Sequence, residues 1–438
     1  MDSGCIGIDW GTYSSKWCYT AADGNVVVGR IWDSRVWRED DDLVMYPLEL
    51  RYQGQFGEEQ LKRKLIFDPD QPFWEGERHR LKTTLGEAVV FSLLALLSDA
   101  RETLTTRGIS LAHSNVLPVR FSHPNWIEPE SIPSLQNYRD AVVVALSGFF
   151  DVLCHGTPEG AIKAPIQCLR EFVKDNKQIS GLPSFPPAYS YDEYQACATG
   201  AVGTLSWALV FESCAAGFPY IVSSPAGLVA PWIRKILVVD IGAGSTDCGY
   251  MLRTIQHGKN EGKPLLIWLP SAPAFERAGN WLTDQILADW RNQGQTQRTK
   301  AEAEDYKTSG VTDWYHKPFV KEWCNSITER VEHYMRNVRD EIRLPRDPGL
   351  EIVITGGSSA VKPIGEHILG GVIFALTARG ISPNLIKATT IVGPPKQMPG
   401  GGYTDVQYAQ LAVCLGASHP GLTQFKHYPN GLREPTLA

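Results

Sequence analysis

Two stretches of the chain place an aspartate and then a glycine turn with hydroxyls directly after a short apolar run. In GCIGIDWGTYS the run ends at Asp9, and in KILVVDIGAGSTD it ends at Asp240. Glycine lets backbone N–H groups approach an anion, and hydroxyls supply further donors. A carboxylate at the end of a strand suits Mg²⁺, which keeps most of its water ligands. The pattern predicts two phosphate-binding loops with Asp9 and Asp240 as metal ligands through water, although an aspartate can also simply cap a strand turn.

A third apolar run ends in a similar way. LEIVITGGSS, residues 350–359, breaks into a glycine pair followed by two serines. In this order and spacing, the three stretches resemble the phosphate-1, phosphate-2 and adenosine motifs of the actin/Hsp70/sugar-kinase ATPase superfamily. The closest resemblance is to an Hsp70-type nucleotide-binding domain, and it covers nearly the whole chain. It implies an α/β, two-lobed, actin-like ATPase fold with ATP or ADP and Mg²⁺ in the cleft between the lobes.

The resemblance assigns nucleotide contacts to all three glycine turns. The residues are Gly11, Thr12, Tyr13 and Ser14 in the first turn, Gly242, Ala243, Gly244, Ser245 and Thr246 in the second, and Gly356, Gly357 and Ser358 in the third. Ser245 and Thr246 compete for one role, because the second loop carries both hydroxyls. Hsp70 proteins place a base-stacking arginine shortly after the glycine pair. Here Ala360 holds that place, and this departure puts adenine affinity in question.

Phosphoryl transfer depends mainly on positive charge around the transferred group, and two lysines compete for that role. Lys82, in HRLKTTLGE, resembles the catalytic lysine that Hsp70 proteins carry in a K-x-x-x-G setting before a core helix. Lys16 follows Asp9 at the spacing where actin-type members place a β-phosphate lysine. An exposed lysine is usually only solvated charge. The Hsp70-like surroundings favour Lys82 slightly.

Three further residues follow from the resemblance. Glu193, in YDEYQACATG, resembles the catalytic glutamate that begins the Ala-rich helix of Hsp70 proteins and orders water and metal near the γ-phosphate. Its alternative role is that of a helix-start glutamate favoured by the dipole. Glu304 and Lys307 resemble the E-x-x-K pair whose stems pack on adenine and ribose, although such a pair is also common on helix surfaces.

Composition limits the other classes of function. The 438 residues are enough for two lobes with separate cores. The formal net charge of −6 argues against a dedicated nucleic-acid binder, which needs a basic face. The longest apolar stretches are too short to span a membrane, and the first residues lack the basic region of a signal peptide. The nine cysteines form no C-x-x-C pair, which is typical of reduced thiols in a cytoplasmic protein.

Periodicity and turn residues predict the elements that position these loops. Strands are expected at 5–10, 15–20, 25–32, 114–123 and 350–355, and helices at 87–107, 138–154, 162–173, 192–208, 278–290, 301–307, 325–342 and 405–417. We expect lobe I at residues 1–230 and lobe II at 231–438. The peripheral subdomains fall at about 31–85 and 273–349. The segment 156–187 departs from the family pattern; it is by default a decorative insertion and alternatively a partner-binding loop.

The favoured function is that of an Hsp70-like, chaperone-like ATPase whose slow hydrolysis switches lobe closure. A separate protein partner would detect that closure, since the resemblance extends to no peptide-binding domain. An actin-like filament-forming ATPase and a small-molecule kinase of the same superfamily remain as alternatives. Neither the Walker G-x-x-x-x-G-K-[ST] motif nor a complete Rossmann glycine fingerprint occurs in the sequence.

Overall fold

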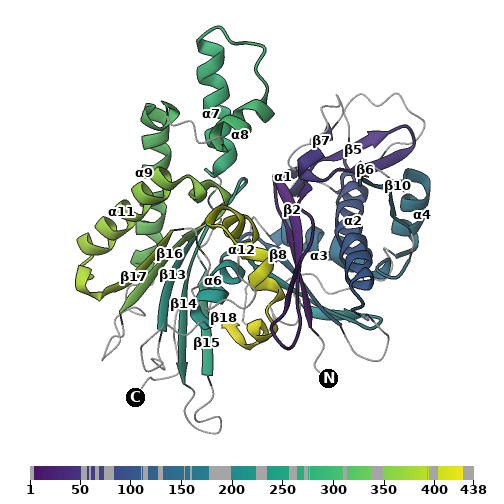
Figure 1. Cartoon of the computed structure of the whole chain (residues 1–438), viewed down its shortest axis with the longest axis horizontal. Helices are drawn as coiled ribbons and strands as arrows, with labels where there is room; N and C mark the ends of the chain where they lie inside the picture. The colour runs from purple at the N-terminus through teal and green to yellow at the C-terminus, as the bar shows by residue number, and fades with distance from the viewer. Residues whose placement is uncertain are drawn as a thin grey trace. The chain divides into compact units, whose positions relative to one another are not determined.

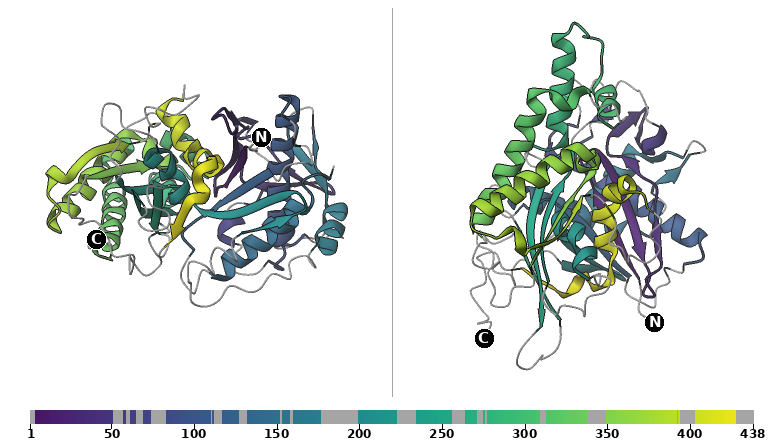
Figure 2. Two further views of the ribbon diagram at one scale, coloured as in Figure 1. Left: turned by 90° about the horizontal axis from the view of Figure 1, so that it is seen from below. Right: turned by 60° about the vertical axis from the view of Figure 1, so that its left-hand side comes forward.

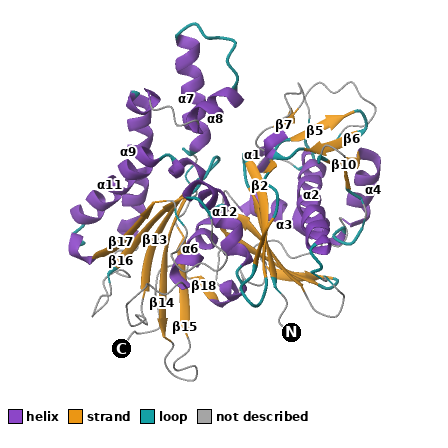
Figure 3. Ribbon diagram, in the orientation of Figure 1, coloured by secondary structure: helices purple, strands orange, loops and turns teal. Residues whose placement is uncertain are grey.

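The computed structural model describes residues 4–50, 57–58, 61–64, 69–73, 83–109, 111, 117–126, 132–151, 153–157, 160–176, 199–222, 234–255, 264–270, 275, 277–308, 313–337, 349–391, 393 and 403–427. Within these residues the fold is mixed α/β, with sheets of seven, five and six strands (Figure 3), so the predicted α/β class is confirmed. The chain forms two compact units. Unit 1 comprises Met1–Phe211 and Val413–Leu422, and unit 2 comprises Glu212–Ala412 and Thr423–Ala438. The first boundary between the units follows Phe211, whereas the sequence predicts it after residue 230.

The large sheet of unit 1 is built outward from an N-terminal hairpin. Its strands in spatial order are β11 (Thr199–Val202), β12 (Leu205–Phe211), β8 (Leu117–His123), β1 (Cys5–Trp10), β2 (Ser14–Thr20) and β3 (Val26–Val28), with β4 (Trp32–Asp33) paired to β2. β1 is antiparallel to β2 and parallel to β8, which is in turn parallel to β12. Every residue of β1 is buried, so both faces of this strand must be covered.

Different helices cover the two faces of β1. The face of Ile8 and Trp10 packs toward α2 (Leu85–Thr106) and α3 (Ile132–Ser147), where Trp10 stacks on Tyr138 at 5.2 Å. On the opposite face Gly7 lies against the last residues of α12 (Asp405–Ser418), so close that a Cβ would meet the Cys414 carbonyl. Glycine therefore allows this helix to lie directly on the strand.

A second, smaller sheet belongs to unit 1. Its strands in order are β7 (Gly57–Glu58), β5 (Val36–Glu39), β6 (Asp42–Met45), β10 (Ile162–Pro165) and β9 (His155–Gly156). The short helix α1 (Leu61–Lys64) and α4 (Ile166–Asn176) complete the described part of this region. The helix predicted over 162–173 is wrong at its start, because residues 162–165 alternate buried and half-buried side chains and pair with β6. The segment thus extends a sheet.

Unit 2 contains the six-stranded sheet. The spatial order is β17 (Ile386–Ile391), β16 (Leu350–Thr355), β13 (Arg234–Ile241), β14 (Thr246–Ile255), β15 (Pro264–Pro270) and β18 (Phe425–His427). Its helices are α6 (Glu212–Val222), α7 (Gly279–Asn292), α8 (Lys300–Thr308), α9 (Pro318–Asn337), α11 (Lys362–Ala378) and the first part of α12. β13 is antiparallel to β14 and parallel to β16, and β16 is parallel to β17.

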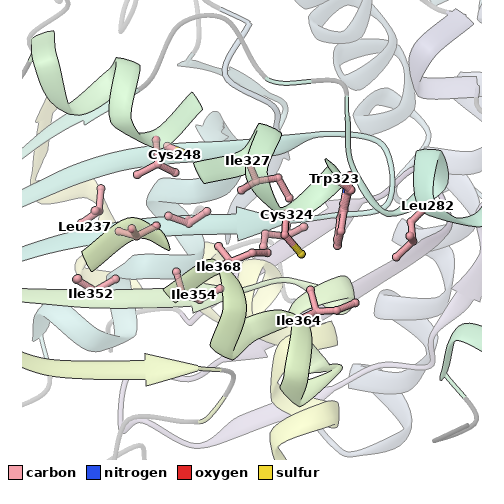
Figure 4. Packing of buried hydrophobic residues seen from close by; sticks show 14 of the residues in the cluster. Leu237, Cys248, Leu282, Trp323, Cys324, Ile327, Ile352, Ile354, Ile364 and Ile368 are labelled. Atoms are coloured by element: carbon pink, nitrogen blue, oxygen red, sulfur yellow. The ribbon is translucent and has the colours of Figure 1, made fainter. Parts of the chain in front are cut away.

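The core of unit 2 lies between this sheet and helices α7, α9 and α11. Alternate residues of β13 and β16, such as Leu237 and Ile352, meet Ile327 of α9 and Ile368 of α11 (Figure 4). Helices α9 and α11 lie side by side in the views of Figure 2. The opposite face is covered by α6, where Gly217 lies against Val238. Burial on both faces explains the continuous apolar run from Ile236 to Val239 in β13.

The two units repeat one order of elements, apart from β4, β11 and the small sheet of unit 1 with its helices α1 and α4. In unit 2 this order can be followed by the labels in Figure 1. In each unit, two antiparallel strand pairings are followed by helices, a strand parallel to the first, another helix and a second parallel strand. The spatial orders correspond as β12-β8-β1-β2-β3 in unit 1 and β17-β16-β13-β14-β15 in unit 2. The repeat seen in the two Asp–Gly sequences is therefore a repeat of topology as well.

Most predicted elements are confirmed, and besides the helix over 162–173 three more differ in extent or type. The helix predicted over 138–154 is α3, which begins at Ile132 with Pro133 in its first turn and ends before Gly148. The helix predicted over 325–342 already begins at Pro318. The helix predicted over 192–208 is wrong across 199–208, where β11 and β12 form a hairpin with Gly203 at φ +57° in its two-residue turn. No helix in the described ranges is both long and apolar enough to cross a membrane.

Candidate functional site

The first Asp–Gly loop joins β1 to β2, and residues 11–13 form its turn. Asp9 and Lys16 are opposite each other in the antiparallel register. Their side chains form a buried ion pair, with Lys16 Nζ 2.7 Å from Asp9 Oδ2. Ser122 of β8 donates a hydrogen bond to the other carboxylate oxygen at 3.1 Å. The structure thus places two of the predicted site residues in direct contact, and Lys16 neutralises the charge of Asp9.

The second loop has the same framework between β13 and β14. Asp240 and Asp247 are opposite in the register, and the Gly242 amide donates to the Ser245 carbonyl at 2.9 Å. Ser245 Oγ donates to Asp247 Oδ2 at 2.7 Å. Thr246 Oγ1 is buried, and within the described part of the chain it makes no hydrogen bond. The two competing hydroxyls therefore differ: Ser245 is bound to Asp247, whereas Thr246 retains its hydrogen-bonding capacity.

The third glycine turn lies against the second loop. Strand β16 runs parallel to β13 with Thr355 opposite Asp240 in the register, and Gly356 follows at φ +91°. A Cβ at Gly356 would lie 2.6 Å from Asp240 Oδ1. Ser358 Oγ donates to the Gly242 carbonyl at 3.4 Å. Two of the three predicted motifs are therefore brought together within unit 2.

The two side chains of the predicted E-x-x-K pair are buried and form an ion pair with each other. Lys307 Nζ lies 2.7 Å from Glu304 Oε2, 3.0 Å from Thr283 Oγ1 and 3.2 Å from the Gly279 carbonyl. An ammonium group has three protons to donate, so these acceptors use all of them. Thr283 also donates to Glu304. In this arrangement the pair connects α8 to the start of α7.

That connection reaches the second loop through the backbone. The amides at the start of α7 donate to the loop carbonyls, Gly279 to Gly242 at 3.0 Å and Asn280 to Ala243 at 2.7 Å. The pair formed by Glu304 and Lys307 therefore positions α7, and α7 positions residues 242–243. Glu304 and Lys307 thus help to support residues 242–243, and the packing of their stems on adenine and ribose stays a prediction.

Lys82 and Glu193 lie outside the described residues, so two of the predicted catalytic residues have no position here. A lysine that was not among the predicted site residues is buried in the structure: Lys62 of α1 is only 4% exposed. Its charge acts on His123, the last residue of β8. Burial, with a smaller contribution from Lys62, lowers the pKa of His123 to about 3. In the sequence Lys62 lies in GEEQLKRK, which has the composition of a polar segment.

Glu212 is a second residue that the sequence analysis missed. It is buried and begins α6 directly after β12. The next residues, SCAAG, are small, so α6 matches the predicted small-residue helix with an initial glutamate better than the segment around Glu193 does. The recognisable signal was the alternating strand LSWALVF immediately before this glutamate, with buried side chains at every second position.

A scan against models of known protein families finds no match for this chain, and no curated protein sequence matches it either. Among the described side chains, no group of three or more His, Cys, Asp and Glu residues could hold a metal ion.

Proposed function

We propose that this chain is a member of the actin-like ATPase class that binds Mg-ATP, hydrolyses it slowly and changes conformation with the nucleotide. The single observation that carries the proposal is the repeated unit. The seven-stranded and six-stranded sheets each contain an Asp–x–Gly hairpin, β1–β2 and β13–β14. The strand that ends at the aspartate also pairs with a parallel strand on its other side, β8 or β16. Asp9 and Asp240 occupy equivalent positions in the two units. Such a repeat supports two equivalent phosphate loops more strongly than either sequence motif does alone.

The side chains around the second loop fit a phosphate and a hydrated cation. Thr246 Oγ1 and Thr355 Oγ1 are buried hydroxyls without a hydrogen bond in the described structure, and both lie next to Asp240 or its loop. Buried polar groups are nearly always hydrogen-bonded, so such hydroxyls are candidates for ligand contacts. Mg²⁺ would be held by Asp240 through water, and when bound it would offset charge on the phosphate oxygens.

We propose a role for each of the charged residues. We assign the phosphate-facing positive charge to Lys16 in the first loop, with Lys62 and Lys82 as the other candidates. Glu212 takes the water-ordering role that the sequence analysis gave to Glu193. The pair formed by Glu304 and Lys307 keeps residues 242–243 in place. A nucleotide-dependent protein partner completes the proposal, because a switch needs a receptor that binds one state better than the other.

Calorimetric titration with Mg-ATP tests the proposal. We expect wild-type protein to bind, and Asp240→Asn to weaken binding about tenfold or more, because a contact to a charged group is lost. Lys62→Met should lower turnover more than affinity if its charge acts on the transferred phosphate. Glu322→Gln, at a surface ion pair with Arg277, serves as the control variant and should bind as wild type does.

Thermal unfolding of every variant shows whether a lost affinity merely reflects lost folding. No binding by folded wild-type protein at millimolar Mg-ATP would refute the proposal. Binding accompanied by phosphate transfer to a small metabolite, with hydrogen exchange identical in ATP and ADP, would replace the switch with a kinase.

A further inference from the structure

Two buried thiols of unit 1 lie in contact. Cys18 of β2 and Cys414 of α12 have their sulfur atoms 2.8 Å apart, and both side chains are fully buried. This distance is shorter than thiols normally pack, and longer than the roughly 2.05 Å of a disulfide bond. The two residues are separated by 396 positions in the sequence. The fold thus brings together two cysteines that no spacing pattern in the sequence would connect.

The surrounding contacts hold this pair in register. Gly7, opposite Cys18 on β1, leaves room for the helix backbone at Cys414. Beyond the thiols, Thr20 Oγ1 and Ser418 Oγ are hydrogen-bonded at 2.7 Å. Arg120 Nη1 donates to the Ala417 carbonyl at 2.9 Å. The end of α12 is therefore fixed on the sheet by contacts on both sides of the sulfur pair, which keeps the thiols in one relative position.

We propose that Cys18 and Cys414 form a reversible disulfide when the protein meets a peroxide oxidant. Peroxide oxidises one sulfur to a sulfenic acid, and one molecule of water leaves. The second thiol then attacks that sulfur, an S–S bond forms and a second water departs. In total two S–H bonds are broken, and the two electrons reduce the O–O bond of the peroxide. A dithiol reductant reverses the reaction by thiol–disulfide exchange.

The rate of this reaction depends on how far the two thiols are exposed to solvent. The thiolate is the reactive form, and burial disfavours it. Burial, followed by the hydrogen bond with Cys414, raises the pKa of Cys18 well above its usual range. The thiols consequently react slowly while α12 stays on the sheet, and faster when its end lifts away. Once formed, the bond connects β2 to α12 covalently and restricts the unfolded chain, which stabilises the folded state.

The test is hydrogen peroxide treatment of the full chain, followed by unfolding, alkylation of free thiols, digestion and mass spectrometry. We expect peptides containing Cys18 and Cys414 to be joined, with the loss of two hydrogen atoms, and to separate after dithiothreitol. The link should form faster in a low urea concentration that loosens α12. The oxidised wild type should unfold several degrees higher than the reduced protein, and Cys414→Ala should abolish this difference.

Cys248→Ala removes a fully buried thiol of unit 2 and is the matched control; it should leave the link unchanged. Exposed Cys168 reports that the oxidant has acted. The inference is overturned if Cys168 is oxidised while Cys18 and Cys414 are recovered as separate alkylated peptides, with and without urea. A link from either residue to a different cysteine would overturn it as well. The wild-type peptide map decides the matter even if the Cys414 variant fails to fold.

Discussion

The ion pair between Lys16 and Asp9 allows a quantitative test of the first loop. Its side chains are 9% and 7% exposed, and the charged atoms are 2.7 Å apart. With an effective dielectric constant of about 20, the attraction is about 6 kcal/mol, before the desolvation of both groups is subtracted. Removing one partner of a buried pair typically destabilises a protein by about 3–5 kcal/mol, because the other charge remains buried. Lys16→Met keeps an unbranched side chain, one heavy atom shorter, and removes the charge.

We therefore expect Lys16→Met to lower the free energy of unfolding by about 3–5 kcal/mol. Asp9→Asn keeps an acceptor for Ser122 and should also destabilise. The double variant should lose about 2–3 kcal/mol less than the sum of the two single variants, because both charges are then absent. Urea unfolding gives the free energies, and hydrogen exchange of the β1 and β2 amides shows whether the loss is local to this hairpin.

Glu322→Gln provides the control, since its pair with Arg277 is 61% and 45% exposed. An exposed pair of this kind contributes less than about 1 kcal/mol. Losses that simply add in the double variant would refute the reasoning, because they would show that the two charges do not interact in the folded protein. A loss in Lys16→Met no larger than that of the control would refute it too.

Two further predictions concern the second loop and the first sheet. Gly356→Ala should destabilise by about 2 kcal/mol, because an L-residue is strained at this positive φ and its Cβ would press on the Ile241 backbone and on Asp240. Urea unfolding should show a much smaller effect for Gly357→Ala, whose Cβ would meet nothing within 4 Å, and equal effects would contradict this. Burial of Asp99 outweighs the hydrogen bonds from Trp17 and Trp32 and raises its pKa above 3.8. The stability that this group contributes is therefore complete below pH 3.8, and it is lost as the pH rises through the pKa of the folded state. Asp99→Asn cannot ionise and should gain stability relative to wild type from pH 3.8 to neutrality, and a difference independent of pH would count against this assignment.

The sequence predicted the elements with strong local signals. Helix α2 was predicted over 87–107 from its long apolar periodicity. In the structure it begins slightly earlier, at Leu85, after a capping box formed by Thr84 and Glu87. The hairpin of β11 and β12 was missed because an Ala-rich stretch favoured a helix, whereas tertiary pairing with β8 decided the outcome. The same error placed the predicted small-residue helix before β12, whereas the small-residue helix α6 begins after β12, at Glu212.

Contacts between distant residues could not be predicted from the sequence. Lys16 was identified by its spacing from Asp9, and the register of one hairpin was enough to place the two together. The closed arrangement of Lys307, Thr283 and Glu304 depends on how α7 packs on α8, which no periodicity specifies. The pairing of Cys18 with Cys414 depends on the last turns of α12 lying on the first sheet. Local patterns specify elements, and packing specifies their partners.

The two equivalent hairpins differ in the charge opposite their first aspartate, and this difference bears on where a cation would bind. In unit 1 the opposite residue is Lys16, so the carboxylate of Asp9 is already neutralised. In unit 2 it is Asp247, and both carboxylates of that cross-strand pair are buried. A divalent cation beside Asp9 would have to compete with the Lys16 ammonium group for the carboxylate. The proposed Mg²⁺ therefore belongs to the second loop, and Asp240→Asn should impair Mg-ATP binding more than Asp9→Asn does.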